Sequence, residues 1–369
     1  MSKRFVVCFD GTWNMPREDE RFEARLRVIA NRALGWLTGP DGLFAKDTNV
    51  EKISKAIAST GSDGLTQMVY YDRGVGTNWY DALAGGVAGI GLSRNIRQGY
   101  HYLARNYDEG DEIFIFGFSR GAYTARSLAG MISRCGLLPK REVSHIEADR
   151  NPALLETYLV YRGRGTYLDR GVAQGLLKSL GARDAPIKML GVWDTVGALG
   201  IPVPQLDDFN KALYEFHDTE LSDKVYNAFH ALAVDEHRQP FAPTLWDAEI
   251  KPWQRMEQRW FIGSHCDVGG GNPSSLLSNI TLKWMMDNAK ALGLTFNAAP
   301  TINENDYLSP FRDSYNELLG IFTWLGERSY RTIGGTRSGR EVVDNTVINR
   351  LDRDPEYQPK NPGLKPGLS

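Results

Sequence analysis

Short apolar runs, each ending in polar or glycine-rich residues, recur along the chain. The runs at residues 4–9, 68–71, 113–118 and 186–193 are rich in apolar, aromatic and β-branched side chains, which predicts buried strands. Residues 255–262, which end in Trp-Phe-Ile, are predicted to form a further strand. Segments with a helical spacing of apolar residues separate several of these runs. Strands that alternate with helices are typical of a mainly parallel sheet covered on both faces, so the pattern predicts an α/β fold with three layers.

The helical spacing also places individual helices. It predicts helices at residues 18–38, 92–106, 280–292 and 310–325, and a further helix that ends near residue 57. The sequence Asp-Thr-Asn at residues 47–49 is a suitable N-cap for that further helix, because short polar side chains accept hydrogen bonds from the first turn.

Two weaker helical patterns, at residues 140–185 and 202–245, are interpreted as helical insertions over the edge of the sheet. No internal repeat or charged linker divides the chain, so we predict a single domain over residues 1–352. The tail at residues 353–369 is rich in proline and glycine and is expected to be extended or disordered.

The composition narrows the class of protein. The 369 residues are 42% hydrophobic, and the net charge of −2 comes without a long basic run, which argues against a dedicated nucleic-acid-binding protein. Cys8, Cys135 and Cys266 have no spacing that suggests a disulfide framework or a zinc site. The sequence shows neither a signal peptide nor a membrane-spanning run, so we expect synthesis in the cytoplasm. Export by a route that needs no signal peptide stays open.

The sequence GFSRG at residues 117–121 lies between a predicted strand and a predicted helix. A G-x-S-x-G in that position makes a sharp turn on which the serine, here Ser119, stands clear as a nucleophile. The alternative is an ordinary strand-to-helix turn that contains a serine. The flanking elements favour the nucleophile and predict an α/β-hydrolase-like sandwich.

The loop after the first strand carries Asp10, Gly11 and Thr12. In hydrolases an early loop supplies one N–H of the oxyanion hole, beside the N–H of the residue after the nucleophile. The backbone N–H groups of Arg120 and of either Gly11 or Thr12 are therefore the candidate oxyanion donors. Asp10 either supports this site or simply closes a turn.

An aspartate and a histidine at later strand ends complete the candidate chemistry. Asp194 follows the strand at residues 186–193, and His265 follows the strand at residues 255–262 and precedes three glycines. Asp235, Asp247 and Asp267 remain alternatives for the acid, and Asp267 is also a candidate supporting residue.

Residues 235–238, the sequence DEHR, are interpreted as a solvated helix end. The alternative is a metal site at His230 and His237, although these residues lack the H-E-x-x-H type of spacing.

With these residues in view, the chain resembles the DUF2235 family of α/β-hydrolases, which includes the catalytic domain of type VI secretion phospholipase effectors. The resemblance rests on blocks that run in family order from residue 9 to about residue 351: FDGTWN, TNV, GDEIFIFGFSRGAYTARSLAG, GVWDTVGALG, FHDTELS, HALAVDEHRQPFAPTLW, FIGSHCDVGGG and the DSY at Asp313. Ile262, Ser264 and Cys266 depart from the family form around the histidine.

The resemblance implies a serine hydrolase in which Ser119, Asp194 and His265 form the triad and lipid or phospholipid esters are the substrates. It also implies peripheral contact with a membrane and, for an effector, a cognate immunity protein. No metal or organic cofactor is expected. Two other classes of protein stay open. One is a non-catalytic binding module in which the GFSRG turn, or nucleophile elbow, is present but idle, that is, without activity. The other is a metal-dependent phosphoesterase that uses Asp10, Asp194, His265 and Asp267.

Overall fold

A computed structural model of the chain describes residues 2–11, 47–74, 87–163, 177–196, 220–313 and 327–364, together with Gly175 and Tyr315. The helix expected at residues 18–38 lies outside this part of the chain. Most of the helix expected at residues 310–325 lies outside it as well.

The described residues form one sheet of seven strands in which each neighbouring pair is parallel. The strand order is β2-β1-β3-β4-β5-β6-β7. The strands are β1 (Lys3–Phe9), β2 (Thr66–Asp72), β3 (Glu112–Phe118), β4 (Ile187–Trp193), β5 (Asn227–Ala233), β6 (Arg255–Phe261) and β7 (Glu341–Val343). The five strands predicted from sequence are present, and the predicted α/β fold with a parallel sheet is confirmed.

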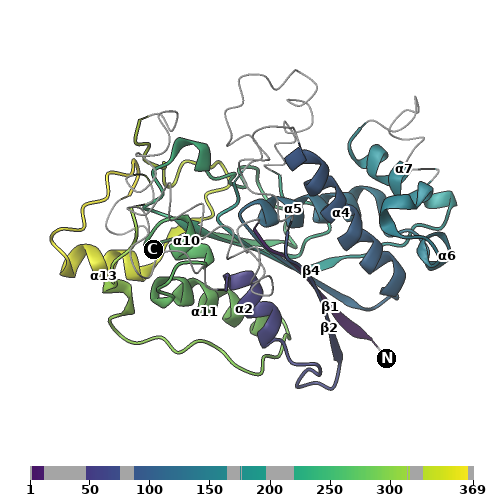
Figure 1. Ribbon diagram of the computed structural model, residues 1–369, viewed down its shortest axis with the longest axis horizontal. Coiled ribbons are helices and arrows are strands. Elements are labelled where there is room, and N and C mark those ends of the chain that lie inside the picture. The colour runs from purple at the N-terminus through teal and green to yellow at the C-terminus, as the bar shows by residue number, and fades with distance from the viewer. Residues whose placement is uncertain are drawn as a thin grey trace, which may run out of the picture.

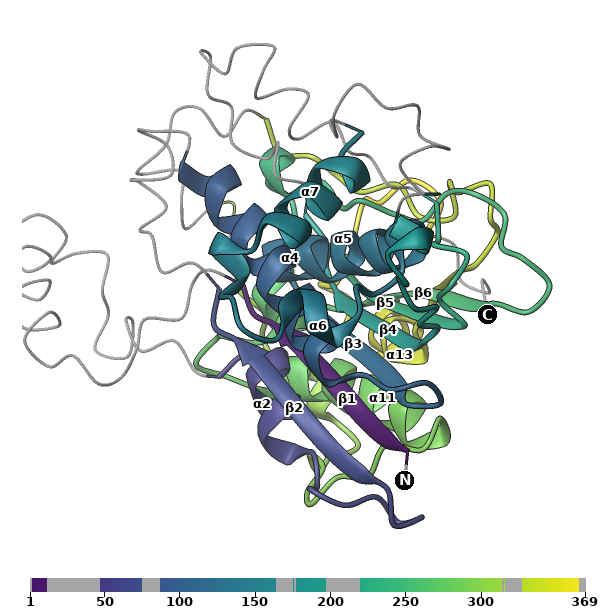
Figure 2. The same ribbon diagram turned by 90° about the vertical axis from the view of Figure 1, so that its right-hand side faces the viewer.

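Helices cover both faces of the sheet, as Figure 1 and Figure 2 show from two directions. One face carries α4 (Val87–Asn106), α5 (Arg120–Cys135), α6 (Lys140–Val143) and α7 (Pro152–Tyr161), and the opposite face carries α2 (Asn49–Ala56) and α11 (Leu276–Ala291). The remaining helices are α10 (His265–Gly269), α13 (Asn345–Arg353), and the short 3-10 turns η1 (Ala148–Arg150), η2 (Gln239–Phe241) and η3 (Asp306–Leu308). Within the described ranges, no helix combines the length and apolar character that crossing a membrane requires.

The first strand shows why the strand sequences are continuously apolar. Phe5, Val7 and Phe9 point into the core beneath α4 and α5, whereas Val6 and Cys8 point into the core beneath α2 and α11. Because both faces of this parallel sheet are covered, every position of the strand after Lys3 is buried. The strand therefore reads as a solid apolar run without the alternation of a half-exposed strand.

One expectation from sequence is wrong. Residues 202–245 were expected to be a helical insertion, but Asn227–Ala233 form β5, in the middle of the sheet between β4 and β6. The strand sequence NAFHALA is rich in alanine and contains a histidine, residue types that suit a helix as well as a strand. Burial between two neighbouring strands overrides this weak local preference.

The C-terminal residues pack closely despite their irregular backbone. Between residues 354 and 364 there is no helix or strand, as expected from the proline and glycine content. However, Tyr357 and Asn361 are buried, and their side chains donate hydrogen bonds to Asp235 Oδ2 and to the backbone carbonyls of Val234 and Arg331. This segment therefore contacts the loops at the carboxyl end of the sheet.

Candidate active site

Ser119 lies on a sharp turn between β3 and α5. Its backbone angles are φ 57° and ψ −122°, a conformation that residues other than glycine rarely adopt. Its N–H donates to the carbonyl of Trp193 at 3.0 Å, and its carbonyl accepts the N–H of Tyr123 at 3.3 Å. The strained strand-to-helix turn expected from GFSRG is present.

The two glycines of the motif make this turn sterically feasible. A Cβ added to Gly117 would lie 2.5 Å from the carbonyl oxygen of Gly121, and a Cβ added to Gly121 would lie 2.2 Å from the carbonyl oxygen of Phe9. Backbone atoms cannot move away as a flexible side chain can. Both positions therefore need glycine so that α5 can pack directly on the ends of β3 and β1.

The turn is located where the chain reverses its direction across the sheet. From β1 the chain passes to β2 on one side, and β3 lies on the other side of β1. Such a switch point opens a crevice at the carboxyl ends of the strands, where α/β proteins bind ligands. Gly11 lies at this point, because a Cβ added to it would be 3.4 Å from the Cβ of Ser119.

The candidate oxyanion donors differ in their availability. Arg120 is the first residue of α5, so its N–H has no acceptor within the helix. The N–H of Gly11 donates to Oδ1 of Asp10 at 2.7 Å, which directs it toward that carboxylate. Thr12 lies outside the described residues.

Asp10 holds the loop after β1 in place. Its Oδ2 accepts hydrogen bonds from the hydroxyl of Tyr71 at 2.6 Å and from that of Thr48, the N-cap of α2, at 2.7 Å. Burial raises the pKa of Asp10 to about 6, although the hydrogen bonds from Tyr71 and Thr48 oppose the rise. Asp10 thus links β1, β2 and α2 immediately beside Ser119.

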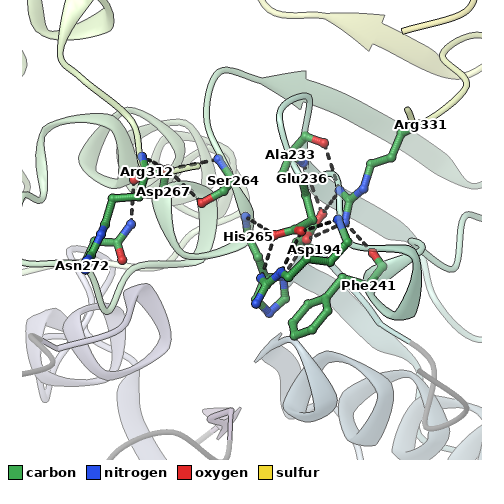
Figure 3. A network of polar contacts seen from close by, with 11 residues as sticks. Asp194, Ala233, Glu236, Phe241, Ser264, His265, Asp267, Asn272, Arg312 and Arg331 are labelled. Carbon is green, nitrogen blue, oxygen red and sulfur yellow. Dashed lines mark hydrogen bonds and ion pairs between the residues drawn. The ribbon is translucent and has the colours of Figure 1, made fainter. Parts of the chain in front are cut away.

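His265 and Asp194 contact each other directly, as Figure 3 shows. Asp194 follows β4, His265 is the first residue of α10 after β6, and Nδ1 of the ring lies 2.6 Å from Oδ2 of the carboxylate. Because a carboxylate only accepts hydrogen bonds, Nδ1 is the donor of this contact, and in the neutral ring Nε2 is then the acceptor. Nε2 is buried and has no hydrogen-bond partner in the part of the chain that the structure describes.

Asp194 is fully buried and has three further donors. Arg331 donates from Nη1 to Oδ1 at 2.6 Å and from Nη2 to Oδ2 at 3.0 Å, and the N–H of Ala233 donates to Oδ1 at 3.1 Å. Burial alone would raise the pKa of Asp194, but the charge of Arg331 and the hydrogen bond from His265 outweigh it and hold that pKa well below its usual range. Asp194 also has a positive φ of 37°, which marks a second strained position at this edge of the sheet.

Aromatic rings enclose the imidazole of His265. The ring of Phe118 lies 4.6 Å from it, centroid to centroid, and the ring of Phe241 lies 5.1 Å from it, edge to face. No hydrogen bond joins the hydroxyl of Ser119 to Nε2 of His265 among the described contacts. The residue before Ser119, Phe118, nevertheless packs on the His265 ring.

Residues 235–238 are not a solvated helix end. Glu236 is buried, its carboxylate accepts hydrogen bonds from Nε and Nη2 of Arg238 at 2.8 and 2.6 Å, and it also accepts the backbone N–H of His265 at 3.3 Å. Burial would raise the pKa of Glu236, but Arg238 outweighs it and lowers that pKa to about 2. The expectation failed because a run of charged residues does not reveal that its members pair with one another.

The alternative acids lie elsewhere. Asp235 accepts hydrogen bonds from the N–H of Gly263 at 2.7 Å and from the hydroxyl of Tyr357 at 3.1 Å. Asp267 forms a capping box with Ser264 at the start of α10, and Asp247 pairs with Arg337 at 2.8 Å near the surface. Figure 3 shows the Asp267 contacts on the opposite side of His265 from Asp194. Asp194 is thus the carboxylate that contacts the imidazole.

The remaining histidines and cysteines near the site have other contacts. His230 lies on β5 and accepts the N–H of Thr195 at its Nε2, at 3.1 Å, whereas His237 lies beside the carbonyl of Ser329. Burial raises the pKa of the Cys266 thiol to about 12. Over the described ranges, no three His, Cys, Asp or Glu side chains gather in a way that could hold a metal ion.

The chain matches a known protein family over most of its length. The family model described as "T6SS, Phospholipase effector Tle1-like, catalytic domain" matches residues 3–288, a range that includes Ser119, Asp194 and His265. An uncharacterized protein of Saccharomyces cerevisiae is 27% identical over 266 residues, which are 65% of this chain and 32% of that protein.

Three solved structures are similar at low sequence identity. An uncharacterized protein from Pseudomonas aeruginosa has 18% identity and a TM-score of 0.45, over 80% of this chain and 46% of that chain. The Tle1 effector bound to the VgrG spike of the Type 6 secretion system has 18% identity and a TM-score of 0.39, over 74% of this chain and 51% of that chain. A propionate-bound esterase of Thermogutta terrifontis has 12% identity and a TM-score of 0.29, over 81% of this chain and 86% of that chain.

The chain thus spans 32% of the yeast relative and 46% and 51% of the first two solved chains.

Proposed function

The chain belongs to the family of Tle1-like phospholipase effector catalytic domains of the type VI secretion system, and from that premise we propose that it is a serine hydrolase of lipid or phospholipid esters. Ser119 is the nucleophile, His265 is the general base, and Asp194 orients the imidazole. One observation carries the proposal: beside the strained Ser119 turn, His265 binds Asp194 through Nδ1 and keeps an unpartnered Nε2 among the described residues.

The reaction proceeds by acyl transfer in two steps. Nε2 of His265 takes the proton of Ser119 as Oγ bonds to the ester carbonyl carbon, and the same proton passes to the leaving alcohol when the ester bond breaks. Water then loses a proton to His265 and attacks the acyl group, which leaves as a carboxylic acid while Ser119 regains its proton. Asp194 stays ionised throughout, because Arg331 outweighs the effect of burial on its pKa.

The oxyanion formed in each step is stabilised by backbone donors. Arg120 supplies one N–H from the start of α5, where the helix dipole also favours negative charge. The second donor is Thr12 or Gly11. The Gly11 N–H would have to be shared between the oxyanion and Oδ1 of Asp10.

The family supplies the expectation about substrates and partners. A phospholipid substrate requires peripheral contact with a membrane during turnover. The related Tle1 effector was solved bound to a VgrG spike, and we propose export through such a secretion apparatus for this chain as well. For an effector of this kind, a cognate immunity protein that blocks the site is expected.

The test is labelling of the purified protein with a fluorophosphonate, beside Ser119→Ala, followed by product analysis on mixed phospholipid vesicles. Labelling of Ser119 together with fatty-acid release is the expected result. Labelling without lipid cleavage would keep the serine hydrolase and move the substrate to soluble esters. Absence of labelling in a folded protein would contradict the proposal and favour a binding module with an idle elbow.

A further inference from the structure

We infer that Arg331 is a positioning residue of this site: its guanidinium fixes the carboxylate of Asp194 against the His265 ring and offsets the charge of that carboxylate. The inference rests on the proposed function, since it assigns a role within the same site. Arg331 acts through Asp194 and is not proposed to touch the substrate.

Several hydrogen bonds fix the orientation of the Arg331 guanidinium against the Asp194 carboxylate. Both Nη atoms bind the carboxylate, and they also donate to the carbonyls of Ala233 at 2.9 Å and Phe241 at 2.6 Å. The carbonyl of Arg331 itself accepts a hydrogen bond from the buried amide of Asn361 at 3.0 Å. Figure 3 shows the guanidinium on the opposite side of the Asp194 carboxylate from His265. The carboxylate therefore cannot rotate away from the ring.

The charges around His265 are matched in pairs. Asp194 pairs with Arg331, and Glu236 pairs with Arg238, with all four side chains buried. Two other ionisable groups interact electrostatically with these residues, His230 on β5 and Cys266 on α10. Arg126 on α5 acts in turn on His230, and Asp267 on α10 acts on Cys266.

An isolated buried aspartate would hold the imidazole in its protonated form, because no other charge would balance the carboxylate. A base that is already protonated cannot accept the serine proton. The positive charge of Arg331 opposes this tendency of the carboxylate to favour the protonated imidazole, and it leaves the hydrogen bond between Asp194 and Nδ1 of His265 in place. The guanidinium therefore does two separable things: it supplies a charge, and it supplies donors that hold the carboxylate.

Two substitutions separate these contributions. Arg331→Lys keeps the charge and loses the two-pronged geometry, whereas Arg331→Gln keeps one donor and loses the charge. Arg331 lines a cavity of about 250 Å³, which leaves room for either side chain to adjust. Arg350→Met is the matched control. Arg350 is also buried in the C-terminal segment, but it donates to the carbonyls of Tyr307 and Ser309 and does not contact Asp194.

The experiment follows the protonation of His265 by NMR as the pH is varied. The full chain is labelled at its six histidines, and His265→Asn identifies the His265 signals. In Arg331→Gln the midpoint of the His265 titration should rise by about one pH unit, the effect of unmasking a neighbouring charge. In Arg331→Lys and in Arg350→Met it should stay near the wild-type value.

The outcomes separate the inference from the proposed function. An unchanged midpoint in folded Arg331→Gln, or the same rise in Arg350→Met, would overturn the inference. If Arg331→Gln does not fold while Arg331→Lys does, the inference would also be overturned, whatever the His265 titration of Arg331→Lys shows. The charge at position 331 would then serve the stability of the fold alone. Fluorophosphonate labelling of the wild type tests the proposed function separately, and the titration has an answer whether or not labelling occurs.

Discussion

The ring of Phe118 packs on the imidazole of His265, with centroids 4.6 Å apart and planes tilted by 32°. Phe118 is the last residue of β3, and His265 begins α10 after β6, so this contact reaches across the ends of β4 and β5. Its neighbour Ser119 is thereby tied to the histidine by packing, even in the absence of a hydrogen bond between them. The glycine at position 269 leaves the space that the Phe118 ring occupies.

Gly269→Ala should disturb this packing. The added Cβ would lie 1.9 Å from a carbon of the Phe118 ring, so the ring or α10 must move. We expect a loss of stability of about 1–3 kcal/mol from overpacking and a fluorophosphonate labelling rate reduced by about tenfold or more, because misplacement of a reacting group is costly. Gly175→Ala is the control, since a Cβ there meets no atom within 4 Å. Equal labelling rates in both variants would argue against a functional role for the contact.

Asp194→Asn should lower kcat by about ten-thousandfold, because an amide no longer selects the imidazole tautomer with its proton on Nδ1. Asp235→Asn changes a carboxylate that is also buried at this edge of the sheet but binds Gly263 and Tyr357. It should leave kcat within a few-fold of the wild type. Steady-state kinetics on a p-nitrophenyl ester compare the two, and a larger fall in Asp235→Asn would reassign the acid.

Asp235 should make the protein more stable as the pH falls from 7 to 4. Burial raises its pKa from 3.8 to about 6 in the folded chain, so the folded state takes up a proton at a higher pH than the unfolded state does. The stability it contributes is complete below pH 4 and is lost as the pH rises through 6. Relative to Asp235→Asn, the wild type should therefore lose up to about 3 kcal/mol between pH 4 and 7.

Denaturant unfolding of the two proteins at each pH measures this difference, which must be taken between variants because other groups titrate in the same window. Asp10, with its pKa also raised to about 6 by burial, acts in the same direction as Asp235. His230 acts in the opposite direction: burial and then Arg126 lower its pKa to about 3, so its contribution is lost as the pH falls below 6.5. A pH-independent difference between wild type and Asp235→Asn would contradict the prediction.

Ester hydrolysis should be unaffected by a chelator. Both oxygens of Asp194 are engaged by Arg331, and those of Asp267 by Ser264 and Asn272, so neither carboxylate is presented as a metal ligand in this arrangement. Activity measured after dialysis against EDTA, with and without added divalent cations, makes the comparison. Loss of activity that a metal restores would favour the phosphoesterase alternative instead.

Much of the sheet and the positions of the candidate site residues were readable from the sequence because their signals are local. An apolar run followed by a polar residue marks a buried strand and its carboxyl end, and Ser119 and Asp194 directly follow such runs. His265 comes shortly after a strand of mixed composition that ends in the apolar Trp260 and Phe261. In a parallel sheet those ends share one edge, so their approach to one another followed from the fold class. The membership of the family, expected from the sequence blocks, is confirmed.

What the sequence did not predict depends on contacts between distant residues. Arg331 lies 137 positions from Asp194, and nothing in its own neighbourhood distinguishes it from a surface arginine. Glu236 and Arg238 were predicted to be solvent-exposed, because a run of charged residues does not show which of them pair with one another or become buried. Their place directly after the apolar HALAV, at a strand end, was the signal that could have revealed them.

The order of elements along the sheet has a practical consequence for anyone choosing what to clone. The family match stops at residue 288, inside α11, whereas β7 and Arg331 come later in the chain. A fragment cut at that point would uncover the three β6 residues that pair with β7, which favours pairing with a strand of another molecule, and would leave buried Asp194 without the guanidinium of Arg331. Sequence similarity therefore outlines a shorter unit than the one that must be expressed, purified and assayed together, which extends at least to Asn361.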